Sequence, residues 1–290
     1  MSELQTKREQ AFLKVQERVQ AVRQRYAEST VQWTNILLYG DFGTGKTQTL
    51  STAPRPIFID SFDPGGTKTA ALQPLIEAGD IVVENRWEMD MWKNPKVFGE
   101  WEREMDLRRR DNFFDHFGTY ALDSITKWAQ ALMYEILKRG TKGRSRAGER
   151  PEMQDYLVQQ LTAVDWMGQL MQLPCHVIVT GHIGLMKDEV TGKMETGLML
   201  EGKLSEKVPL VFDEKYVTRA TQSSSGIAYK LQTRNDGYYK AETRMGGGEF
   251  DTFEEPDIRA LLMRAGRAWQ DRPGLFPESK DSIPPGEKEE

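Results

Sequence analysis

The segment from Gly40 to Thr47 reads G-D-F-G-T-G-K-T and follows the apolar run ILLYG at 36–40. Glycines in such a loop let backbone N–H groups curve around phosphate oxygens, and the helix that follows directs its positive end at them. A lysine at the place of Lys46 reaches the β and γ phosphates, and the threonine hydroxyl binds Mg²⁺. The pattern therefore predicts a nucleotide-binding loop between a strand and a helix. An incidental glycine turn is the alternative, which the preceding strand disfavours. The residues expected to contact the nucleotide are Gly40, Asp41, Phe42, Gly43, Thr44, Gly45, Lys46, Thr47 and Gln48.

Short apolar runs alternate with longer helix-competent stretches over the first two thirds of the chain. These runs lie at 36–40, 57–60, 81–84, 119–123 and 176–181. Such alternation predicts an α/β fold with a mostly parallel sheet covered by helices on both faces. Beyond residue 208 the pattern changes, and three runs joined by tight turns predict an antiparallel meander that closes the same sheet. They lie at 216–220, 226–234 and 237–244, and a last helix is expected after Pro256.

The two ends of the chain differ from its middle. Ala11, Val15, Val19, Val22 and Tyr26 recur at helical spacing among charged residues, so we expect an amphipathic helix within 1–32. It either contacts another subunit, as a possible oligomerisation element, or covers its own core. The last twenty residues hold six acidic and three basic residues and four of the 13 prolines, which indicates a disordered tail. The expected division is therefore helix 1–32, core 33–268 and tail 269–290.

The charge balance and the few sulfur and imidazole side chains exclude several classes of protein. With 39 basic and 44 acidic residues the net charge is −5, so any nucleic-acid site must be a local basic patch. One cysteine cannot form an internal disulfide, and three histidines allow no zinc motif. No apolar run approaches the roughly 18 residues that cross a bilayer, and the first residues do not resemble a signal peptide. We therefore expect a cytoplasmic protein without a membrane partner.

The run from Thr119 to Asp123 ends in a carboxylate. Strand ends of this kind lie at the carboxyl edge of an open α/β sheet, where ligands bind. Asp123 is therefore the expected partner of Thr47 in holding Mg²⁺. As an alternative, Asp123 caps the helix that begins at Ser124.

The run at 177–181 is followed by His182, a neutral polar ring at the same expected edge of the sheet. We expect His182 to sense the γ-phosphate. A histidine after a strand is more often an ordinary surface or core residue, and only the neighbouring motifs favour the functional role.

The order of these motifs resembles the RecA-like ATPase core, and most closely the phage P-loop family of RecA-like single-strand annealing proteins. The motifs are the glycine loop, FID at 58–60, ALDS at 121–124, VIVTGH at 177–182, a long loop, FDEKYVTRA at 212–220 and YKAETR at 239–244. The resemblance covers residues 33–245. It implies a RecA-like P-loop NTPase with a mostly parallel central sheet flanked by helices, an antiparallel C-terminal extension, and ATP and Mg²⁺ as cofactors.

In RecA-like ATPases the segment after the strand that corresponds to 119–123, and after the helix that follows it, carries one DNA-binding loop. Its counterpart here is 138–150, with six basic residues and one acidic residue. A solvated surface loop is the alternative. The residues expected to follow the phosphates of single-stranded DNA are Lys138, Arg139, Lys142, Arg144, Arg146 and Arg150.

The resemblance places a second DNA-binding loop at 184–207. Lys187, Lys193 and Lys203 lie there among leucines and methionines, which could wedge between unstacked bases. The alternative is a β-hairpin whose apolar side chains pack on the core. We expect this segment to be long and flexible.

The resemblance also assigns a role to Lys240 and Arg244, because late basic residues of RecA-like oligomers reach the γ-phosphate bound by a neighbouring subunit. By composition alone they are ordinary exposed charges. One position departs from the family: Phe62 stands where RecA-like ATPases have the glutamate that orients water. Asp60 or Asp63 replaces it, or hydrolysis is slow. The expected catalytic residues are Lys46, Asp60, Asp63, Asp123, His182, Lys240 and Arg244.

These features predict a Mg-dependent ATPase, stimulated by DNA, that oligomerises as a ring or filament on single-stranded DNA and promotes annealing or strand pairing in phage recombination. A single-stranded DNA-binding protein is a further candidate partner, and the host cytoplasm is the expected compartment if a phage encodes the chain. Two alternatives stay open. One is a P-loop small-molecule kinase that uses the arginines of 138–150 as a lid, and the other is a nucleotide-gated scaffold with weak catalysis.

Overall fold

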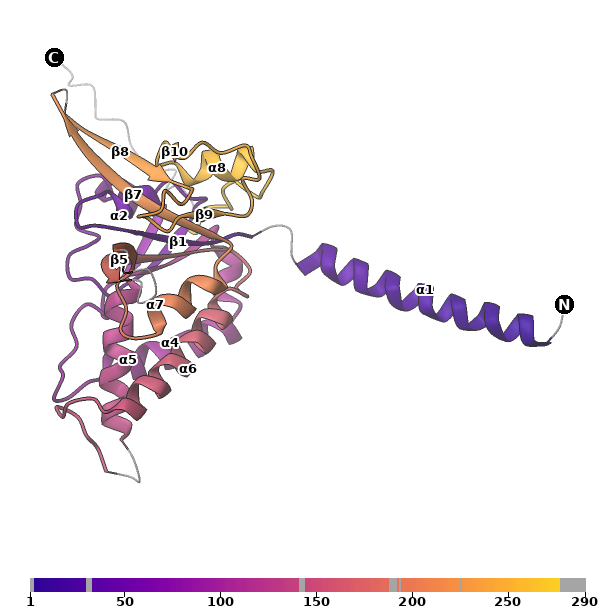
Figure 1. The fold of residues 1–290 in the computed structure, drawn as a ribbon, viewed down its shortest axis with the longest axis horizontal. Coiled ribbons are helices and arrows are strands. Elements are labelled where there is room, and N and C mark those ends of the chain that lie inside the picture. The colour runs from indigo at the N-terminus through magenta and orange to yellow at the C-terminus, as the bar shows by residue number, and fades with distance from the viewer. Residues whose placement is uncertain are drawn as a thin grey trace, which may run out of the picture.

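The computed structural model describes residues 3–29, 33–140, 144–187, 192, 194–224 and 226–276 of the chain. Its centre is a ten-stranded sheet (Figure 1). In spatial order the strands are β10 (Phe253–Glu254), β8 (Gly226–Gln232), β7 (Glu214–Ser223), β1 (Asn35–Gly40), β5 (His176–Lys187), β4 (Thr119–Asp123), β2 (Ile57–Ser61) and β3 (Ile81–Glu84), while β6 (Met194–Leu198) pairs with β5 and β9 (Glu242–Thr243) with β7.

The strands from β7 to β3 pair in parallel, which confirms the mostly parallel α/β sheet expected from the apolar runs. Their register decides which strand ends meet. Gly40 at the end of β1 lies beside His182 of β5, and Ser61 of β2 lies beside Asp123 of β4. The carboxyl ends that carry the predicted motifs are therefore gathered at one edge of the sheet.

Helices cover both faces of the sheet, because the strands alternate apolar side chains between two separate cores (Figure 1). Trp101, Trp128 and Trp166 pack on one face, and Leu50 and Ile258 on the other. The first face carries α4 (Val97–Arg110), η1 (Phe113–His116), α5 (Ile125–Arg139), α6 (Met153–Leu170), α7 (Leu204–Lys207) and η2 (Val208–Val211). The second carries α2 (Lys46–Leu50), α3 (Gln73–Glu77) and α8 (Ile258–Arg264).

Asp60 is completely buried beneath α4 and bound by four side chains. Its carboxylate accepts hydrogen bonds from the indoles of Trp87 and Trp101 at 2.8 and 3.0 Å. Arg108 donates to both oxygens at 3.0 and 3.1 Å, and the Tyr120 hydroxyl donates at 2.9 Å. This corrects the expectation that Asp60 orients water, because all of its contacts lie inside the protein core.

The C-terminal extension differs from a simple meander. β8 pairs antiparallel with β7 as expected, but β9 pairs with the first residues of β7 instead of with β8. The physical reason is Glu214, a buried carboxylate at the start of β7. It accepts hydrogen bonds from the backbone nitrogens of Arg244 at 2.8 Å and Met245 at 2.7 Å.

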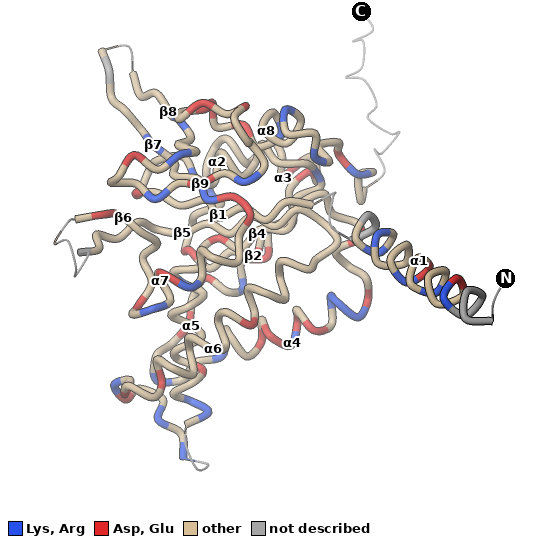
Figure 2. The backbone as a smooth tube through the Cα atoms, turned by 45° about the vertical axis from the view of Figure 1, so that its right-hand side comes forward, with Lys and Arg blue, Asp and Glu red and all other residues tan. Residues whose placement is uncertain are grey.

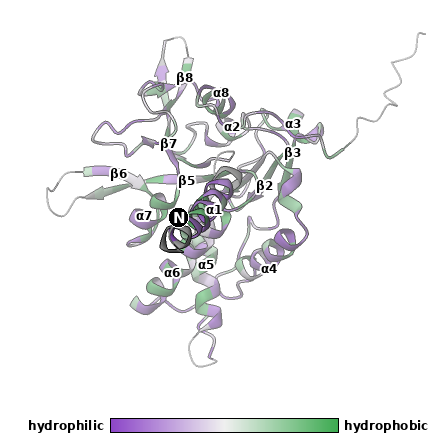
Figure 3. Cartoon of the chain, turned by 90° about the vertical axis from the view of Figure 1, so that its right-hand side faces the viewer, coloured by the Kyte–Doolittle hydropathy of each residue, from purple (hydrophilic) through white to green (hydrophobic). Residues whose placement is uncertain are grey.

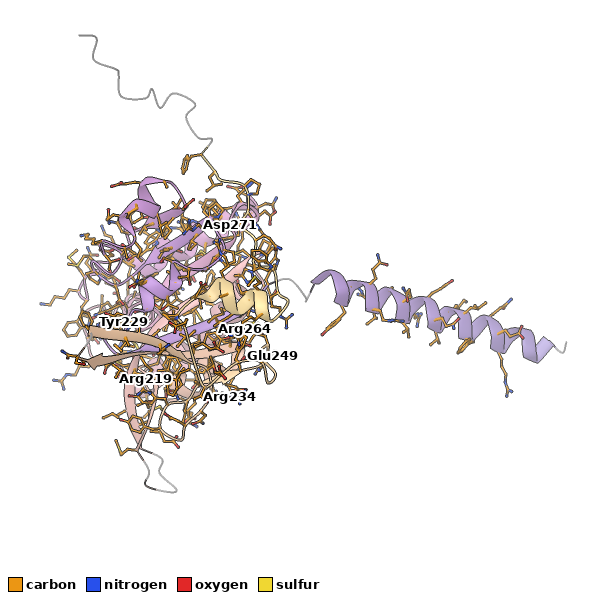
Figure 4. All side chains as sticks on the ribbon, turned by 90° about the horizontal axis from the view of Figure 1, so that it is seen from above. Arg219, Tyr229, Arg234, Glu249, Arg264 and Asp271 are labelled. Atoms are coloured by element: carbon orange, nitrogen blue, oxygen red, sulfur yellow. The ribbon has the colours of Figure 1, made fainter. Side chains whose placement is uncertain are left out.

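The expected helix after Pro256 is α8, which begins where the Asp257 side chain accepts a hydrogen bond from the backbone nitrogen of Ala260. Two arginines bind the backbone of the loop that precedes α8. Arg234 donates a hydrogen bond to the carbonyl of Phe250 at 2.8 Å, and Arg264 donates one to the carbonyl of Glu249 (Figure 4).

The chain continues to pack beyond residue 268. Arg272 donates hydrogen bonds to the carbonyls of Phe114, Asp115 and Pro174, and its guanidinium lies 4.6 Å from the centre of the Trp33 ring. The prediction of a disordered tail is therefore wrong for 269–276, which contact the core. Residues 277–290 lie outside the described residues.

The expected N-terminal helix is α1 (Glu3–Ser29), which stands away from the rest of the chain (Figure 1). The described side chains of α1, residues 8–26, are all exposed. In the described parts of the chain, no helix combines the length and the apolar character needed to cross a bilayer.

Replacing Arg108 with methionine should lower the free energy of unfolding by about 3 to 5 kcal/mol, because the Asp60 charge would stay buried without its cation. Urea unfolding followed by tryptophan fluorescence measures this loss. Arg110→Met, at an exposed position on the last turn of the same helix, is the control and should change stability little. Equal stability of the two variants would contradict the structural role of the pair.

Candidate nucleotide-binding site

The loop between β1 and α2 has the backbone of a phosphate-binding turn. Gly43 and Gly45 adopt positive φ angles of 73° and 85°, which favour glycine. A side chain at Gly40 would collide with the hydroxyl of Thr218 on β7. That hydroxyl also lies 2.6 Å from the hydroxyl of Thr44, so the neighbouring strand holds the loop in place.

A cavity of about 550 Å³ opens in front of this loop. Its lining combines the loop with the ends of β2, β4 and β5, as the register of the sheet requires. The lining residues are Phe42, Gly43, Gly45, Lys46, Thr47, Gln48, Asp63, Pro64, Gly65, Gly66, Thr69, Ala71, Asp123, Lys127 and His182.

Lys46 is buried at the first position of α2. Its ammonium donates hydrogen bonds to the carbonyls of Gly40 at 3.1 Å and Asp41 at 2.8 Å. Burial lowers the pKa of Lys46, and the charges of Asp123 and Asp63 oppose that effect. The cation therefore lies at the base of the cavity, where it could exchange loop carbonyls for phosphate oxygens.

Asp123 and Thr47 form the pair that the sequence predicts for Mg²⁺. The Thr47 hydroxyl donates to Asp123 at 3.2 Å, and the Thr180 hydroxyl of β5 donates to the other carboxylate oxygen. Burial raises the pKa of Asp123, while the two hydroxyls lower it and Asp63 raises it further. A bound cation would favour the ionised carboxylate.

The donor atoms of this pair suit Mg²⁺, which takes one or two protein oxygens and completes its shell with phosphate and water. Among the described residues, no cluster of three or more His, Cys, Asp or Glu side chains could hold a metal ion. The oxygens of Thr47 and Asp123 would therefore hold Mg²⁺ together with the phosphates of a bound nucleotide.

Asp63 and His182 lie side by side in the lining of the cavity. The Nε2 atom of His182 donates to Asp63 at 3.1 Å, and both side chains are partly exposed. Burial raises the pKa of Asp63, but the hydrogen bond from His182 and the charges of His182 and Lys127 outweigh it, so the pKa lies below its usual value. The cavity thus holds an ionised carboxylate beside an imidazole.

Phe62 shows why the glutamate position of RecA-like ATPases is not available here. Its ring is buried between Trp87 and Trp101, with ring centres 6.5 and 6.1 Å away. The chain leaves the strand after Ser61, and Asp63 then turns into the cavity. Of the two carboxylates predicted to replace the glutamate, Asp63 is the one that lines the site.

A match to a family model places the chain among known proteins. The model AAA_24, described as an AAA domain, matches residues 33–245. The chain belongs to this family. With the parallel sheet and the loop geometry above, the match supports a RecA-like P-loop ATPase, whose general activity is nucleotide hydrolysis.

Two solved structures are similar to the chain, at low TM-scores. A KaiC-like protein of the hyperthermophilic archaeon Pyrococcus horikoshii OT3 has 13% identity and a TM-score of 0.40, covering 73% of this chain and 82% of that one. The flagellar accessory protein FlaH of Methanocaldococcus jannaschii has 11% identity and a TM-score of 0.41, covering 77% and 84%. Scores this low carry no argument about function. A comparison with curated proteins found no match.

Sequence reasoning missed several residues that the AAA domain brings to the cavity. Lys127 on the first turn of α5 adds a second cation, and Thr180 binds Asp123. Glu88 holds the cavity loop by accepting hydrogen bonds from the Ser61 hydroxyl at 2.9 Å and the Gly65 nitrogen at 3.2 Å. Thr180 lies within the VIVTGH motif, two residues before His182, whereas Lys127 and Glu88 belong to no motif. The position of Lys127 three residues after Ser124 offered a second signal.

The basic segment 138–150 begins in the last turn of α5, and the helix, about 22 Å long, separates it from the cavity. Its cations lie beside acids (Figure 2). Lys138 and Arg139 pair with Glu135 at 3.1 Å, and Arg144 pairs with Glu149 at 3.1 Å.

Arg146 is buried and binds both carboxylate oxygens of Asp155 at 3.0 and 2.9 Å. This corrects its assignment to DNA, because the guanidinium is used within the fold. Arg150 is exposed, and Lys142 lies outside the described residues.

The segment expected as a long flexible loop is largely a hairpin, because β5 continues to Lys187 and pairs antiparallel with β6. Leu198 is buried, whereas Leu185, Met194 and Met199 are 65%, 46% and 52% exposed. The hairpin alternative is thus correct for the backbone, but most of these apolar side chains do not pack on the core. The side chain of Lys187 and the whole of Lys193 lie outside the described residues, and Lys203 is exposed.

Lys240 and Arg244 do not line the cavity among the described residues. Lys240 pairs with Glu195 of β6 at 2.7 Å, and Arg244 lies 3.9 Å from Glu242, with each side chain about half exposed. Both therefore lie on the outside of the subunit, and neither reaches the nucleotide cavity of its own chain.

Lys46→Met should weaken ATP binding by about 100-fold, because charge-assisted hydrogen bonds to the phosphates would be lost. Titration with a fluorescent ATP analogue measures the affinity, and circular dichroism checks the fold. Lys68→Met, which removes an exposed lysine from the segment after β2, is the control. Wild-type ATP affinity in Lys46→Met would overturn the assignment of the site.

Proposed function

We propose that this AAA domain is an ATP-dependent single-stranded DNA-binding protein that oligomerises and promotes annealing or strand pairing, as in phage recombination. Lys46, Thr47 and Asp123 hold Mg-ATP at the cavity, and the magnesium supplies charge neutralisation at the phosphates. The observation that carries the proposal is the continuity of β5. This one strand brings His182 to the nucleotide cavity and then forms the exposed hairpin with β6.

The hairpin offers the apolar surface that unpaired bases need. Leu185 and Met199 are exposed on it, and the neighbouring backbone is fixed by pairing between Ile183 and Leu198. Apolar and aromatic surfaces bind single strands because unstacked bases lose contact with water on them. The proposed role of His182 is to transmit the presence of the γ-phosphate along β5 to this surface.

Asp63 is the residue that we assign to water in the hydrolytic step. It lies in the cavity, and with its lowered pKa it is ionised at neutral pH and can accept a hydrogen bond that orients the attacking water. The hydrogen bond from His182 fixes its orientation. A phosphate bound between them would compete for that hydrogen bond, which couples nucleotide state to the position of β5.

Contacts between subunits complete the proposal. Lys240 and Arg244 are exposed away from their own cavity, which suits a role at the γ-phosphate of a neighbouring subunit. Among the expected DNA contacts in 138–150 that the structure describes, Arg139, Arg144 and Arg150 are exposed. In the proposal these arginines contact the phosphates of the DNA strand, and the hairpin contacts its bases.

The kinase alternative is disfavoured by distance. A lid must close over the nucleotide, but 138–150 lies at the far end of α5, and Arg146 is already paired with Asp155. A scaffold with weak catalysis stays the second alternative. Phosphate release measured with and without single-stranded DNA separates it from the proposed ATPase.

The double variant Leu185→Ser and Met199→Ser should bind a single-stranded oligonucleotide about tenfold more weakly, because it removes apolar contact with bases. Fluorescence anisotropy in the presence of a slowly hydrolysed ATP analogue measures the affinity. Leu107→Ser removes a leucine of α4 that is 51% exposed, close to the 52% of Met199, and should leave DNA binding unchanged. Full DNA affinity in the double variant would remove the hairpin from the proposed interface.

Asp63→Asn should slow ATP turnover by about 100-fold while leaving ATP affinity near that of the wild type. Because the pKa of Asp63 is lowered, wild-type turnover should persist in mild acid and fall only below the usual pKa of an aspartate. Phosphate release as a function of pH measures both effects. Unchanged turnover in Asp63→Asn would remove this carboxylate from the hydrolytic step.

A further inference from the structure

The segment between β3 and α4 carries exposed apolar side chains that the proposed function does not use. Met89, Met91 and Trp92 are 79%, 62% and 44% exposed. Trp92 is the only exposed one of the seven tryptophans, all of which lie in the described part of the chain. The segment leads into α4, which lies beside α5 on one side of the sheet (Figure 3). Neighbouring apolar side chains that stay uncovered mark an interaction site.

The backbone that carries these side chains is held by Asp90. One oxygen of its carboxylate accepts hydrogen bonds from the backbone nitrogens of Met91 and Lys96, each at 2.9 Å. The Asn94 nitrogen donates to the carbonyl of Met91 at 2.9 Å, which closes a turn within the segment. Trp92 therefore stands on a fixed turn, so that little conformational freedom is lost when a partner binds.

The basic segment 138–150 lies directly beside this turn. A Cβ atom added at Gly148 would lie 3.1 Å from the Cγ atom and 3.6 Å from the Cα atom of Lys93. Arg150 follows two residues after Gly148, so their Cα atoms are no more than about 7 Å apart. The fold thus brings cations from two separate segments to the neighbourhood of Trp92.

Three cations of this region are available to a ligand. Lys93, Lys96 and Arg150 are exposed, and their side chains form no ion pair with any described residue. The surface therefore combines uncovered apolar side chains with positive charge that the fold does not neutralise.

The acids close to these cations are already bound within the fold. Glu149 pairs with Arg144 at 3.1 Å and with Arg146 at 3.4 Å. Glu88 accepts hydrogen bonds from the loop after β2, and Asp90 accepts those of its own turn. Because these carboxylates have partners, a polyanion that binds here meets the free cations first.

A hollow of about 250 Å³ separates the turn from α5 and borders the nucleotide cavity. Met89 and Tyr134 line it from the turn and from the helix. Pro64 and Lys127 line both the hollow and the nucleotide cavity. The surface around Trp92 is therefore a direct neighbour of the nucleotide site.

We propose that the turn 89–93, together with 148–150, forms a second surface for single-stranded DNA. In it, Trp92 stacks on an unpaired base, while Lys93 and Arg150 contact phosphates. Single-stranded DNA is the occupant that fits, because an aromatic ring stacks on a base face that duplex DNA hides, and the cations bind a polyanion. The inference rests on the proposed function and adds a contact to it that lies outside the hairpin.

The two DNA surfaces leave the sheet at different strands. The hairpin continues β5 and the turn follows β3, with β4 and β2 between them. Neighbouring strands lie about 4.8 Å apart, so the two surfaces begin about 14 Å from each other. Annealing has to hold two strands, and two separate surfaces allow one subunit to contact both.

Trp92→Ala in the full-length protein tests the stacking contact. With a slowly hydrolysed ATP analogue present, its affinity for an oligothymidylate should be about tenfold lower than that of the wild type. Trp92→Phe keeps an aromatic ring and should restore most of this affinity. Met263→Ala, which shortens a 52% exposed methionine of α8, is the control and should bind like the wild type. Fluorescence anisotropy measures the affinities, and titration with the ATP analogue checks that each variant keeps its nucleotide site.

Tryptophan emission reports the contact directly. Oligothymidylate should quench the emission of the wild type, because a base stacks on an exposed indole. Most of this quenching should be absent in Trp92→Phe, even though that variant binds DNA, since the other six tryptophans are less exposed. A residue with only a structural role would not produce this separation of binding from quenching.

Salt dependence tests the phosphate contacts. The double variant Lys93→Met and Arg150→Met should reduce the slope of log affinity against log salt by about 1.4, because each phosphate contact to a single strand contributes about 0.7. Arg110→Met, at the other end of α4, removes an exposed cation away from the turn and should leave the slope unchanged.

The outcomes separate this surface from the proposed function. Wild-type DNA affinity in Trp92→Ala, or an unchanged salt slope in the double variant, would overturn the second surface and leave the hairpin in place. Equal weakening of duplex and single-strand binding in Trp92→Ala would contradict base stacking. Weaker self-association of Trp92→Ala in light scattering, with DNA affinity unchanged, would assign the surface to a contact between copies. A wild-type protein that binds no single-stranded DNA would overturn the proposed function itself.

Discussion

Parallel hydrogen bonding between β1 and β5 places Gly40 of the phosphate-binding loop directly beside His182. The same strand β5 lies against β4, so the Thr180 hydroxyl reaches Asp123, which in turn binds Thr47. A shift of one residue in this register would turn both Thr180 and His182 to the other face of the sheet. The cavity therefore depends on strand pairing between segments that are about 140 residues apart in sequence.

The same strand gives the proposed function its mechanical basis. Beyond His182, β5 leaves the parallel sheet and pairs with β6, so the nucleotide cavity and the exposed hairpin share one continuous backbone. A change in the hydrogen bond between His182 and Asp63 would act at the first residue of this connection. In the proposed cycle, that contact couples nucleotide binding to the binding of unpaired bases by the hairpin.

Two aspartates three residues apart have opposite surroundings, and strand geometry explains the difference. Asp60 is within β2, whose alternating side chains place it with Phe58 under α4, where Arg108 and two indoles bind it. Asp63 follows the end of the strand and turns into the cavity. From the sequence both were equal candidates, because the partners of Asp60 lie 27 to 60 residues away.

Local patterns in the sequence determined the phosphate-binding loop, the parallel strands, the helix within 1–32 and the strand-end position of Asp123, because backbone geometry and hydrophobic periodicity act over a few residues. Tertiary structure alone decided that Arg146 is buried against Asp155 and that β9 pairs with β7. It also decided where Arg272 packs and that Lys127 lines the cavity. Each of these depends on which side chains the fold brings together across long stretches of chain. Charge and polarity can be read from a sequence, but the partner that neutralises a charge is set by packing.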